Sequence, residues 1–424
     1  MTASSLKSSA PAGFEGFGLD PALVRGTHEA GFESPRPIQL ETLPAALVGR
    51  DVLGLAQTGT GKTAAFALAV LERLLASTAP GDPRALILAP TRELAQQIDA
   101  EIRLLARFTP ITTATIFGGV SVRAQIGALR RRPAIVVGCP GRVLDLVQQR
   151  ALRLSSVEIL VLDEADHMFD LGFLPDLRRI LSALPTRRQN LLFSATMPRA
   201  IRQLADEVLR DPDVVELTGG APADTIDHAI YAVPEHGKRD LLDRILCEES
   251  CEAAIVFTRT KHRARRLAQQ LEKSGHRTIA LQGNMSQSQR DRAMNGFRAR
   301  RYDVLVATDI AARGIDVSSV SHVINFDVPS TALAYTHRIG RTGRSEREGV
   351  ARTFVTSDDR AWLRDTERMI GTAIPRLQAQ GIPSERLDAE TGRPAPARRS
   401  ATELTCSRNG RNRPSRARRR GRPR

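Results

Sequence analysis

Short apolar runs alternate with longer charged stretches along most of this chain, and the pattern occurs twice. Runs of this length are typical of strands that are buried in a parallel sheet. The stretches between them are long enough for helices, so the pattern predicts βαβ units in each half. The runs of the first half are 52–56, 86–89, 135–138, 159–162 and 191–193, and those of the second half are 254–257, 278–281, 304–307, 322–326 and 350–355.

A turn-rich segment separates the two halves. It reads Thr-Gly-Gly-Ala-Pro-Ala-Asp-Thr at 218–225, a composition typical of a flexible linker. We therefore expect an α/β chain with two parallel-sheet domains in tandem and a tail without a core. The expected parts are a loose N-terminus at 1–12, domain 1 at 13–217, the linker at 218–225, domain 2 at 226–375 and a basic, disordered tail at 376–424.

The net charge of +15 is concentrated in the tail. Residues 391–424 contain twelve Arg, no Lys and a single acid, Glu403. After Arg393 the chain has almost no large apolar residues, which predicts disorder. Guanidinium groups suit phosphate contacts, although a GC-rich genome would also favour Arg over Lys.

Several classes of protein are excluded by composition. No apolar run approaches the roughly 18 residues that span a membrane, and the first ten residues lack the apolar stretch of a secretory signal. A cytoplasmic protein is therefore expected. The spacing of Cys247 and Cys251 is not completed by a second pair of ligands, so we expect ordinary reduced thiols and no zinc site.

A glycine-rich segment follows the first apolar run. Residues 56–63 read Ala-Gln-Thr-Gly-Thr-Gly-Lys-Thr, with Ala56 where a strict phosphate loop begins with Gly. Glycines let backbone N–H groups turn toward phosphate oxygens, Lys62 can reach the β- and γ-phosphates, and the hydroxyl of Thr63 can ligate Mg²⁺. The expected nucleotide-binding residues of this segment are Thr58, Gly59, Thr60, Gly61, Lys62 and Thr63.

The run 159–162 leads directly into two acids, Asp163 and Glu164. A parallel strand delivers such residues to the crevice at its carboxyl end. Asp163 is expected to hold Mg²⁺, partly through water, and Glu164 to accept a proton from the attacking water or to orient it. Alone, the pair would be an ordinary helix start. Together with residues 56–63 it predicts hydrolysis of a nucleoside triphosphate.

The second half has no glycine-rich phosphate loop of its own. This asymmetry predicts one nucleotide held between the domains and not two separate sites.

Residues 163–166 spell D-E-A-D. Further short motifs lie on both sides of this segment, between Phe14 and Arg344. With these motifs the chain resembles the DEAD-box ATP-dependent RNA helicases, most closely the bacterial RhlE-like group. The resemblance implies two RecA-like domains, ATP and Mg²⁺ as cofactors, RNA as the partner, and ATP hydrolysis that RNA stimulates.

The segment Gly-Phe-Glu-Ser-Pro-Arg-Pro-Ile-Gln at 31–39 resembles the Q motif of that family. The resemblance implies that Gln39 hydrogen-bonds the adenine edge, that Phe14 packs on the ring and that Asp316 contacts the ribose. An amide both donates and accepts hydrogen bonds, which suits adenine, so ATP is expected in preference to GTP.

Segments that resemble the RNA-contacting motifs of the family each follow an apolar run. Exposed N–H groups at loops and helix starts favour phosphate contacts there. The family usually has Thr where this chain has Cys139, so the hydroxyl contact to RNA is not available at that position. The implied RNA-binding residues are Pro90, Thr91, Arg92, Gly118, Gly119, Pro140, Gly141 and Arg142 in the first half, and Arg259, Gln282, Gly283 and Thr308 in the second.

Two further sets of residues are implied by the resemblance. Asp166, Ser194, Thr196 and His337 are expected to couple the nucleotide and RNA sites. Arg341 and Arg344 are expected to act as arginine fingers on the γ-phosphate, supplied by the second domain, and such fingers are worth about 10³-fold or more in rate.

The sequence therefore predicts RNA-stimulated ATP hydrolysis that closes the two domains and locally separates short RNA duplexes. An ATP-dependent RNA clamp or chaperone with little unwinding stays open as an alternative, and a translocating DNA helicase is the other rival. Candidate partners are ribosomal precursor RNA and the RNA-degradation machinery, with no membrane. The Arg-rich tail is either a non-specific RNA tether or a solvated segment without a role.

Overall fold

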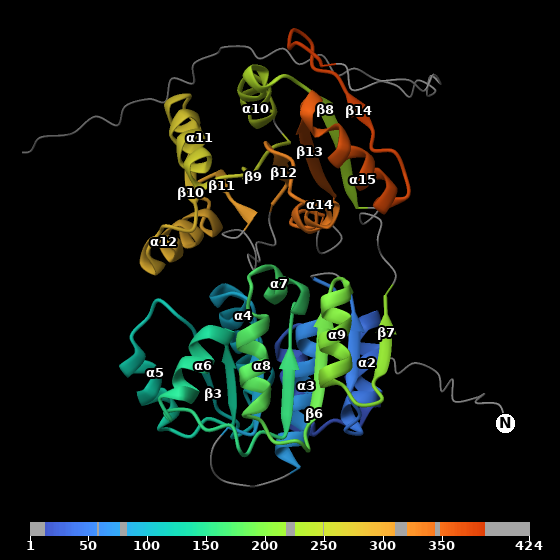
Figure 1. Cartoon of the computed structure of the whole chain (residues 1–424), viewed down its shortest axis with the longest axis vertical. Coiled ribbons are helices and arrows are strands. Elements are labelled where there is room, and N and C mark those ends of the chain that lie inside the picture. The colour runs from blue at the N-terminus through green and yellow to red at the C-terminus, as the bar shows by residue number, and fades with distance from the viewer. Residues whose placement is uncertain are drawn as a thin grey trace, which may run out of the picture.

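A computed structural model of the chain describes residues 13–56, 59–76, 83–217, 225–248, 250–309, 320–343 and 348–385. The predicted N-terminus at 1–12, residues 218–224 of the predicted linker and the predicted tail from residue 386 onward lie outside the described residues. Two α/β domains follow one another along the chain, with domain 1 below and domain 2 above in Figure 1.

Domain 1 is built on a seven-stranded parallel sheet with the order β3-β4-β2-β5-β6-β1-β7. Strands β2, β4, β5 and β6 are buried along their whole length, which is why they read as continuous apolar runs. The strands are β1 (Val52–Leu55), β2 (Ala85–Leu88), β3 (Thr113–Ile116), β4 (Ile135–Gly138), β5 (Ile159–Leu162), β6 (Gln189–Ser194) and β7 (Asp213–Glu216).

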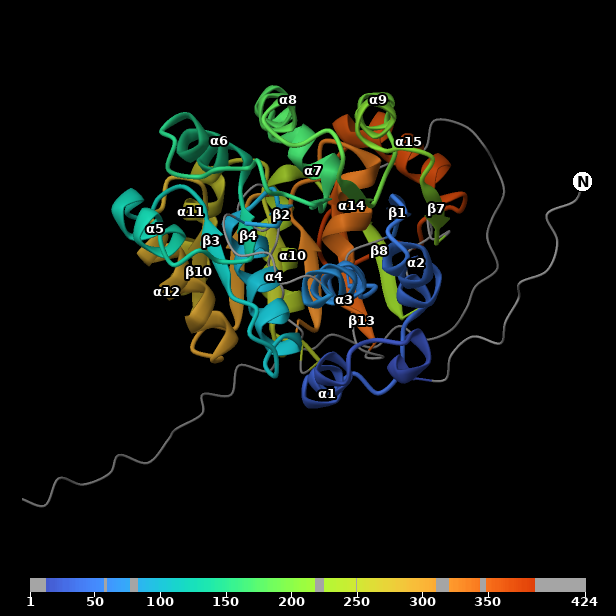
Figure 2. The same cartoon turned by 90° about the horizontal axis from the view of Figure 1, so that it is seen from below.

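Helices cover both faces of this sheet and bury a separate apolar core on each. Figure 2 shows α1, α3 and α4 on one side of the sheet and α6, α8 and α9 on the other. The helices of domain 1 are η1 (Phe14–Phe17), α1 (Pro21–Glu29), α2 (Pro37–Leu47), α3 (Lys62–Leu75), α4 (Arg92–Leu105), α5 (Val122–Leu129), α6 (Pro140–Gln148), α7 (Ala165–Asp170), α8 (Leu174–Ser182) and α9 (Arg199–Val208).

Domain 2 repeats this construction. Its seven-stranded parallel sheet has the order β10-β11-β9-β12-β13-β8-β14. Its strands are β8 (Ile226–Ala232), β9 (Ala254–Phe257), β10 (Thr278–Leu281), β11 (Val304–Ala307), β12 (His322–Asn325), β13 (Gly349–Val355) and β14 (Arg376–Leu377), and its helices are η2 (Glu235–Gly237), α10 (Lys238–Leu246), α11 (Lys261–Lys273), α12 (Gln287–Arg298), α14 (Ala332–Ile339), η3 (Ser357–Asp359) and α15 (Arg360–Ile370).

The two sheets have the same topology. Each strand of domain 2 occupies the position of the strand seven places earlier in the chain, so β8 takes the place of β1 and β12 that of β5. The predicted α/β fold with two parallel-sheet domains in tandem is therefore confirmed. All ten apolar runs are strands, and the strands without a predicted run are β3, β7, β8 and β14. Strands β3, β7 and β14 are edge strands, in which polar residues interrupt the apolar pattern, and β8 lies next to the edge strand β14.

Domain 2 extends beyond the predicted boundary at residue 375. Strand β14 pairs with β8, and the backbone N–H of Glu385 donates to the carbonyl of Ala232 at 3.1 Å. Ala379 and Ile382 pack against the apolar core that contains Phe354. Residues 376–385 therefore belong to the domain and not to the tail, because their contacts come from strand pairing and burial that composition does not reveal.

This boundary gives a stability prediction. A chain ending at residue 375 loses β14 and the packing of Ile382, so the free energy of unfolding of domain 2 should fall by about 1–3 kcal/mol. The single tryptophan, Trp362, lies in α15 and packs on Tyr335 with ring centroids 5.7 Å apart, so its fluorescence in urea reports this domain. A chain ending at residue 385 is the control and should unfold like the full chain. Equal midpoints for both truncations would contradict the assignment.

Candidate functional site

Three neighbouring strands of domain 1 carry the predicted nucleotide site at their carboxyl ends. Strands β5, β6 and β1 lie side by side in the sheet. The acid pair follows β5, Ser194 ends β6, and the glycine-rich segment follows β1. Because all three strands are parallel, residues that are far apart in sequence meet at one edge of the sheet.

Two glycines shape the phosphate loop. Gly59 and Gly61 have φ angles of 87° and 94°, in the left-handed region that side chains disfavour. A Cβ on Gly61 would lie 2.7 Å from Nε2 of Gln39, so the loop also needs glycine for space. The loop leads into α3, whose first turn begins at Lys62 and points its free N–H groups toward the same edge.

Gln39 and Arg36 support this loop from α2. Oε1 of Gln39 accepts from the backbone N–H of Arg36 at 2.8 Å, and its Nε2 donates to the carbonyl of Gly61 at 3.0 Å. The guanidinium group of Arg36 donates to the carbonyl of Gly59 at 2.8 Å. Both polar atoms of the buried Gln39 side chain are thus used inside the protein. Each of these atoms can form one further hydrogen bond, so an adenine contact stays a prediction.

Phe14 also lies in the interior. Its side chain is 2% exposed and packs edge-on against Phe32 with ring centroids 6.1 Å apart, and against Phe17 at 6.3 Å. The predicted packing of Phe14 on adenine therefore stays a prediction. The contacts that the structure shows tie η1 to the segment that leads into α2.

Lys62 lies next to a buried group of carboxylates. Its ammonium group donates to the carbonyl of Ala56 at 2.8 Å, and Asp163, Glu164 and Asp166 are 3%, 8% and 5% exposed. Burial raises the pKa of Asp163 to about 6, and the positive charge of Lys62 opposes that rise. A buried carboxylate with a raised pKa has too little positive charge around it, which fits a bound cation at this position.

The donor set also fits Mg²⁺. This ion keeps several waters and is usually bound by one or two protein oxygens together with substrate phosphates. Asp163 at the end of β5 and the half-buried Thr63 in the first turn of α3 supply a carboxylate and a hydroxyl. No cluster of three or more acidic, His or Cys residues for a cation occurs among the residues that the structure describes, so a cage made of protein ligands alone is not formed there.

Glu164 is held in an unusual backbone conformation. Its φ angle is +51°, which costs on the order of 1–3 kcal/mol for a residue with a side chain and is typical of functional sites. Oε2 of Glu164 lies 3.0 Å from Nδ1 of the buried His167. Burial would raise the pKa of Glu164, but the hydrogen bond and charge of His167, with Lys62 and Arg341, lower it overall. Glu164 is therefore an ionised hydrogen-bond acceptor.

Asp166, Ser194 and Thr196 form a hydrogen-bonded set beside the acid pair. The hydroxyl of Thr196 donates to Oδ2 of Asp166 at 2.8 Å, and that of Ser194 donates to the carbonyl of Thr196 at 2.7 Å. The backbone N–H of Asp166 donates to the hydroxyl of Ser194 at 3.3 Å. The structure thus brings together three of the four predicted coupling residues, which join the start of α7 to the loop after β6.

Domain 2 contributes charge to the same site. The guanidinium group of Arg341, in the buried turn after α14, is among the charges that lower the pKa of Glu164 in domain 1. Arg341 is thus close enough to act on the acid pair. The fourth predicted coupling residue, His337, lies half-buried in the last turn of α14. Thr58, Asp316 and Arg344 lie outside the described residues.

Arg338 was not singled out from the sequence, although it holds α14 in place. Its side chain is 3% exposed and donates from Nη2 to Oδ2 of Asp309 at 2.7 Å. It also donates from Nη1 to the carbonyl of Asp327 at 2.7 Å and lies over the ring of Phe257 at 4.9 Å. Because Arg338 lies within an Arg- and Gly-rich motif, the sequence contained a signal for it. Its partners, which give it a positioning role, are distant in sequence.

The predicted RNA residues of domain 1 surround Arg92. A Cβ on Gly119 would lie 2.0 Å from Nη1 of Arg92, so the guanidinium group rests on the Gly118–Gly119 turn. The charge of Arg92 also acts on the thiol of Cys139, which precedes Pro140, Gly141 and Arg142. The half-buried Arg142 donates to the carbonyl of Val120 at 3.4 Å. The structure thus gathers these segments around one arginine, together with Pro90 and the helix cap Thr91.

Cys139 caps α6 without a side-chain hydrogen bond. Burial raises the pKa of its thiol to about 12, with Arg92 opposing, so the thiol is neutral and unreactive. A threonine hydroxyl at this N-cap position could cap α6. Because Arg92 is its neighbour, the same hydroxyl would face the predicted RNA phosphate.

The predicted RNA residues of domain 2 occupy equivalent positions. In domain 1 they follow β2, β3 and β4, and in domain 2 they follow β9, β10 and β11, which have the same places in the second sheet. Arg259 is exposed and lies 3.6 Å from Asp359, and Gln282 accepts from the backbone of Asn284 at 2.9 Å. Gly283 is exposed, and Thr308 is half-buried at the end of β11.

Domain 2 also has a counterpart of the nucleotide site, but ion pairs fill it. Lys238 begins α10 after β8, as Lys62 begins α3 after β1, and Asp327 follows β12 as Asp163 follows β5. Lys238 is 3% exposed and lies 3.4 Å from Glu235 and 3.9 Å from Asp327, and Arg263 contacts the same two acids. This cluster supports the prediction of one nucleotide site, because its buried lysine is already paired.

One ion pair joins the two domains directly. Arg290 of α12 donates from Nε and Nη2 to Oε1 of Glu93 at 2.9 and 2.6 Å. Glu93 lies in the first turn of α4, next to Arg92. Both side chains are largely buried, at 14% and 16% exposure, so the pair is shielded from water. It connects the predicted RNA-side segments of the two domains, which are 197 residues apart and carry no local signal that they pair.

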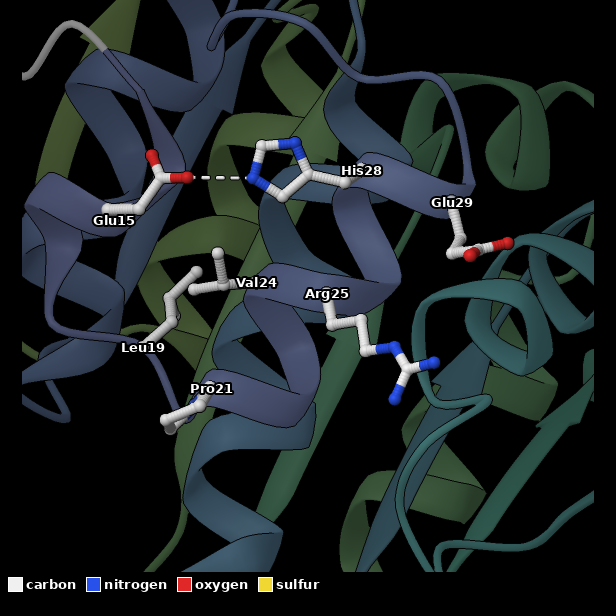
Figure 3. A pocket seen from close by; sticks show the side chains of 7 residues that line it. All are labelled: Glu15, Leu19, Pro21, Val24, Arg25, His28 and Glu29. Atoms are coloured by element: carbon white, nitrogen blue, oxygen red, sulfur yellow. Dashed lines mark hydrogen bonds and ion pairs between the residues drawn. The ribbon is translucent and has the colours of Figure 1, made fainter.

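One cavity is lined by none of the residues described above. It measures about 800 Å³ and is formed by η1 and α1. Figure 3 shows Glu15 and His28 facing one another across it, with Oε1 and Nε2 2.7 Å apart, while Arg25 and Glu29 lie at its other end. It contains no predicted site residue, so it is not part of the predicted nucleotide site.

Comparison with known proteins decides the family. The DEAD/DEAH box helicase profile matches residues 36–204, and the helicase conserved C-terminal domain profile matches residues 237–346. The ATP-dependent RNA helicase CshA of Listeria monocytogenes is 42% identical over 367 residues, which cover 86% of this chain and 70% of CshA. The chain belongs to the DEAD/DEAH box helicase family. The two parallel-sheet domains of this helicase are accordingly RecA-like, and ATP and RNA are its expected ligands.

Two solved structures of one protein, with different bound partners, can be compared with the arrangement of the two domains in this chain. S. cerevisiae Dbp5 bound to RNA and ADP BeF3 is 34% identical, with a TM-score of 0.79 over 87% of this chain and 96% of that one. A variant of Dbp5 bound to Nup159, Gle1, IP6 and ADP has the same identity but a TM-score of 0.60 over 85% of this chain and 95% of that one. The domains of this helicase are thus arranged more as in the RNA-bound structure.

Two expectations, membership of the RhlE-like group and a cytoplasmic location, stay predictions. The curated relative compared above is a CshA protein. Within the described residues, no helix is long and apolar enough to cross a membrane.

The ion pair between the domains gives a prediction about coupling. Replacing Arg290 by glutamine should raise the RNA concentration for half-maximal ATPase activity about three- to tenfold, because the pair is formed only when the domains meet. The double variant Glu93→Gln/Arg290→Gln should be no worse than Arg290→Gln alone. The exposed Arg364 of α15, changed to glutamine, is the control. Additive losses in the double variant would contradict direct coupling.

Cys139 gives a second prediction. Cys139→Thr should raise the thermal stability of domain 1, by about 1 kcal/mol, because the hydroxyl can cap α6. It should also lower the RNA concentration for half-maximal ATPase activity, because the hydroxyl faces the RNA side. Cys139→Ala is the control without a cap. Circular dichroism melting and ATPase assays measure the two effects, and a loss of stability with threonine would contradict the capping argument.

Proposed function

We propose that this helicase hydrolyses ATP at a composite site that is completed when its two domains close on RNA, and that closure separates short RNA duplexes locally. One observation carries the proposal. The buried acid pair belongs to domain 1, and Arg341 of domain 2 is near enough to lower the pKa of Glu164. Domain 1 alone therefore lacks a cation that the site uses.

The proposal assigns a role to each group at the site. The N–H groups at the start of α3 and the Lys62 ammonium group bind the phosphates of ATP, for which Lys62 gives up its bond to Ala56. Asp163 and Thr63 hold Mg²⁺, which neutralises phosphate charge when it is bound. Arg341 stabilises the charge that develops on the transferred phosphoryl group. Arg344 is assigned the same role from its sequence position.

The lowered pKa of Glu164 narrows its role. A carboxylate that holds its proton weakly is a poor general base but a good acceptor for orienting the attacking water. Its strained backbone and its bond to His167 fix the direction of the carboxylate. Of the two roles expected from the sequence, orienting the water is the better supported.

RNA and ATP are coupled through closure. Arg290 and Glu93 lie on the RNA side, Arg341 and Glu164 lie at the nucleotide site, and both pairs need the same arrangement of the domains. A ligand that favours this arrangement at one site tightens binding at the other, and the effect is reciprocal. Asp166, Ser194 and Thr196 connect the acid pair to the end of β6 within domain 1 and support the same coupling.

The central test separates binding from hydrolysis. Lys62→Ala should abolish ATP binding and RNA-stimulated ATPase activity, whereas Glu164→Gln should keep ATP binding and lose about 10²-fold or more of the turnover. Lys273→Ala and Glu41→Gln are matched controls at exposed positions of α11 and α2. Full RNA-stimulated turnover in Glu164→Gln would refute the mechanism. ATP-dependent RNA binding with negligible single-turnover hydrolysis in the unmodified protein would favour the RNA clamp.

The natural RNA stays a prediction. Ribosomal precursor RNA and substrates of the RNA-degradation machinery are candidates, and RNA crosslinked to this helicase in cells, followed by sequencing, identifies it. Using DNA in place of RNA as the ATPase activator tests the DNA helicase alternative.

A further inference from the structure

A groove runs along the free edge of the domain 2 sheet, away from the predicted nucleotide site. Strand β10 is the last strand of that sheet, and α11 and α12 lie on either side of it, as Figure 1 shows at the left of the upper domain. The groove between these helices has a volume of about 700 Å³. We call it the edge groove.

The edge groove is strongly cationic. Lys261 and Arg265 of α11 and Arg292 of α12 line it and are exposed, and a single carboxylate, Glu272, lies among its lining residues. Neither Arg265 nor Arg292 has an ion-pair partner among the described residues. Unpaired cations on both walls of a groove attract a polyanion.

The floor of the edge groove offers polar groups without partners. Because β10 pairs with β11 alone, the N–H and C=O groups along its other side are not used by the sheet. Thr278 lies in this floor, is 7% exposed, and its hydroxyl has no hydrogen-bond partner. Buried hydroxyl groups are normally satisfied, so this one points to a ligand or a partner that completes it.

The edge groove is continuous with the predicted RNA face. Gln282 and Asn284 belong to its lining and to the segment after β10 that carries the predicted RNA contacts. The ammonium group of Lys261 donates to Oδ1 of Asn284 at 3.2 Å and so lies at this junction. A strand that passes over Gln282 therefore meets the cations of the edge groove next.

We infer that the edge groove is an additional binding site for single-stranded RNA, which takes the nucleotides that extend beyond the contacts of the closed domains. The inference rests on the proposed function, because it places this RNA next to that held by the closed domains. The site is directed at the backbone, since its cations and amides suit phosphate and ribose and the phenol ring of Tyr302 is half-buried. The imidazole of the exposed His262 is the other ring of the lining. An acidic peptide is less favoured, because large exposed apolar anchors are lacking in the lining.

The test measures how RNA affinity depends on RNA length, with and without two of the groove's positive charges. The full chain and its Arg265→Gln/Arg292→Gln variant are titrated with RNAs of about 6 to about 20 nucleotides in the presence of a non-hydrolysable ATP analogue. We expect equal affinities for the shortest RNAs and a loss of about three- to tenfold for the longest. The plot of log affinity against log salt should become shallower by about 1.4 for long RNA, since each lost phosphate contact contributes about 0.7.

The control has the same net charge. Lys273→Gln/Arg364→Gln removes two exposed cations of domain 2 outside the edge groove and should leave affinity unchanged at every length. Equal losses in both double variants, or a loss that is the same at all lengths, would show a general charge effect and overturn the inference. Crosslinking of 4-thiouridine in the extended part of the RNA should label peptides of α11 or α12, and labelling confined to other segments would also overturn it.

Failure of this inference is distinguishable from failure of the proposed function. Maximal ATPase activity with saturating short RNA should be unaffected in Arg265→Gln/Arg292→Gln, and its thermal midpoint confirms folding. If the variant binds long RNA as the unmodified protein does and RNA still stimulates its ATPase activity normally, the edge groove is not an RNA site. The proposal of a composite ATP site would then stand unaffected. Binding of an acidic peptide that long RNA does not displace would assign the groove to a protein partner instead.

Discussion

A buried cluster of opposite charges at the carboxyl edge of the domain 1 sheet is the constraint on which the rest of the site depends. Asp163, Glu164 and Asp166 are almost completely buried with a single neighbouring lysine, Lys62. Burying carboxylates without enough positive charge is costly. The deficit is what favours a metal ion, and it is also what makes the arrival of Arg341 from the other domain favourable. In the proposed mechanism, closure and hydrolysis therefore depend on the same shortage of positive charge around the carboxylates.

The repeated topology explains how two similar domains divide the work. In both sheets the predicted RNA residues follow the same three neighbouring strands, so the predicted RNA contacts of the two domains come from equivalent loops. The nucleotide positions diverge. Domain 1 keeps a glycine loop in front of Lys62, whereas the equivalent Lys238 is paired with Glu235 and Asp327. A lysine that is already neutralised is poorly suited to bind phosphate. In the proposed mechanism domain 2 instead contributes Arg341, from a different part of its fold.

Much of this organisation could be predicted from local patterns. Continuous apolar runs identified the buried strands, and Gly59, Gly61 and Lys62 indicated a phosphate loop because that chemistry needs those residues close together in sequence. Strands β7 and β14 were missed because edge strands carry polar residues, and residues 376–385 were assigned to the tail because their partners are more than a hundred residues away. The sequence predicted that Gln39 hydrogen-bonds adenine. The structure shows hydrogen bonds of its side chain with the backbone of Arg36 and Gly61, and the adenine contact stays a prediction.

Local sequence patterns were enough to predict the fold class, the candidate phosphate loop and the acids beside it, because strand burial and loop geometry act over a few residues. Only the tertiary structure decided which distant groups meet. It paired Arg290 with Glu93 across the domains, placed Arg338 against Asp309, filled the second lysine site with acids and left the edge of β10 open between cationic helices. These contacts join segments whose separation in sequence carries no signal, because only packing of the sheets sets their distance in space.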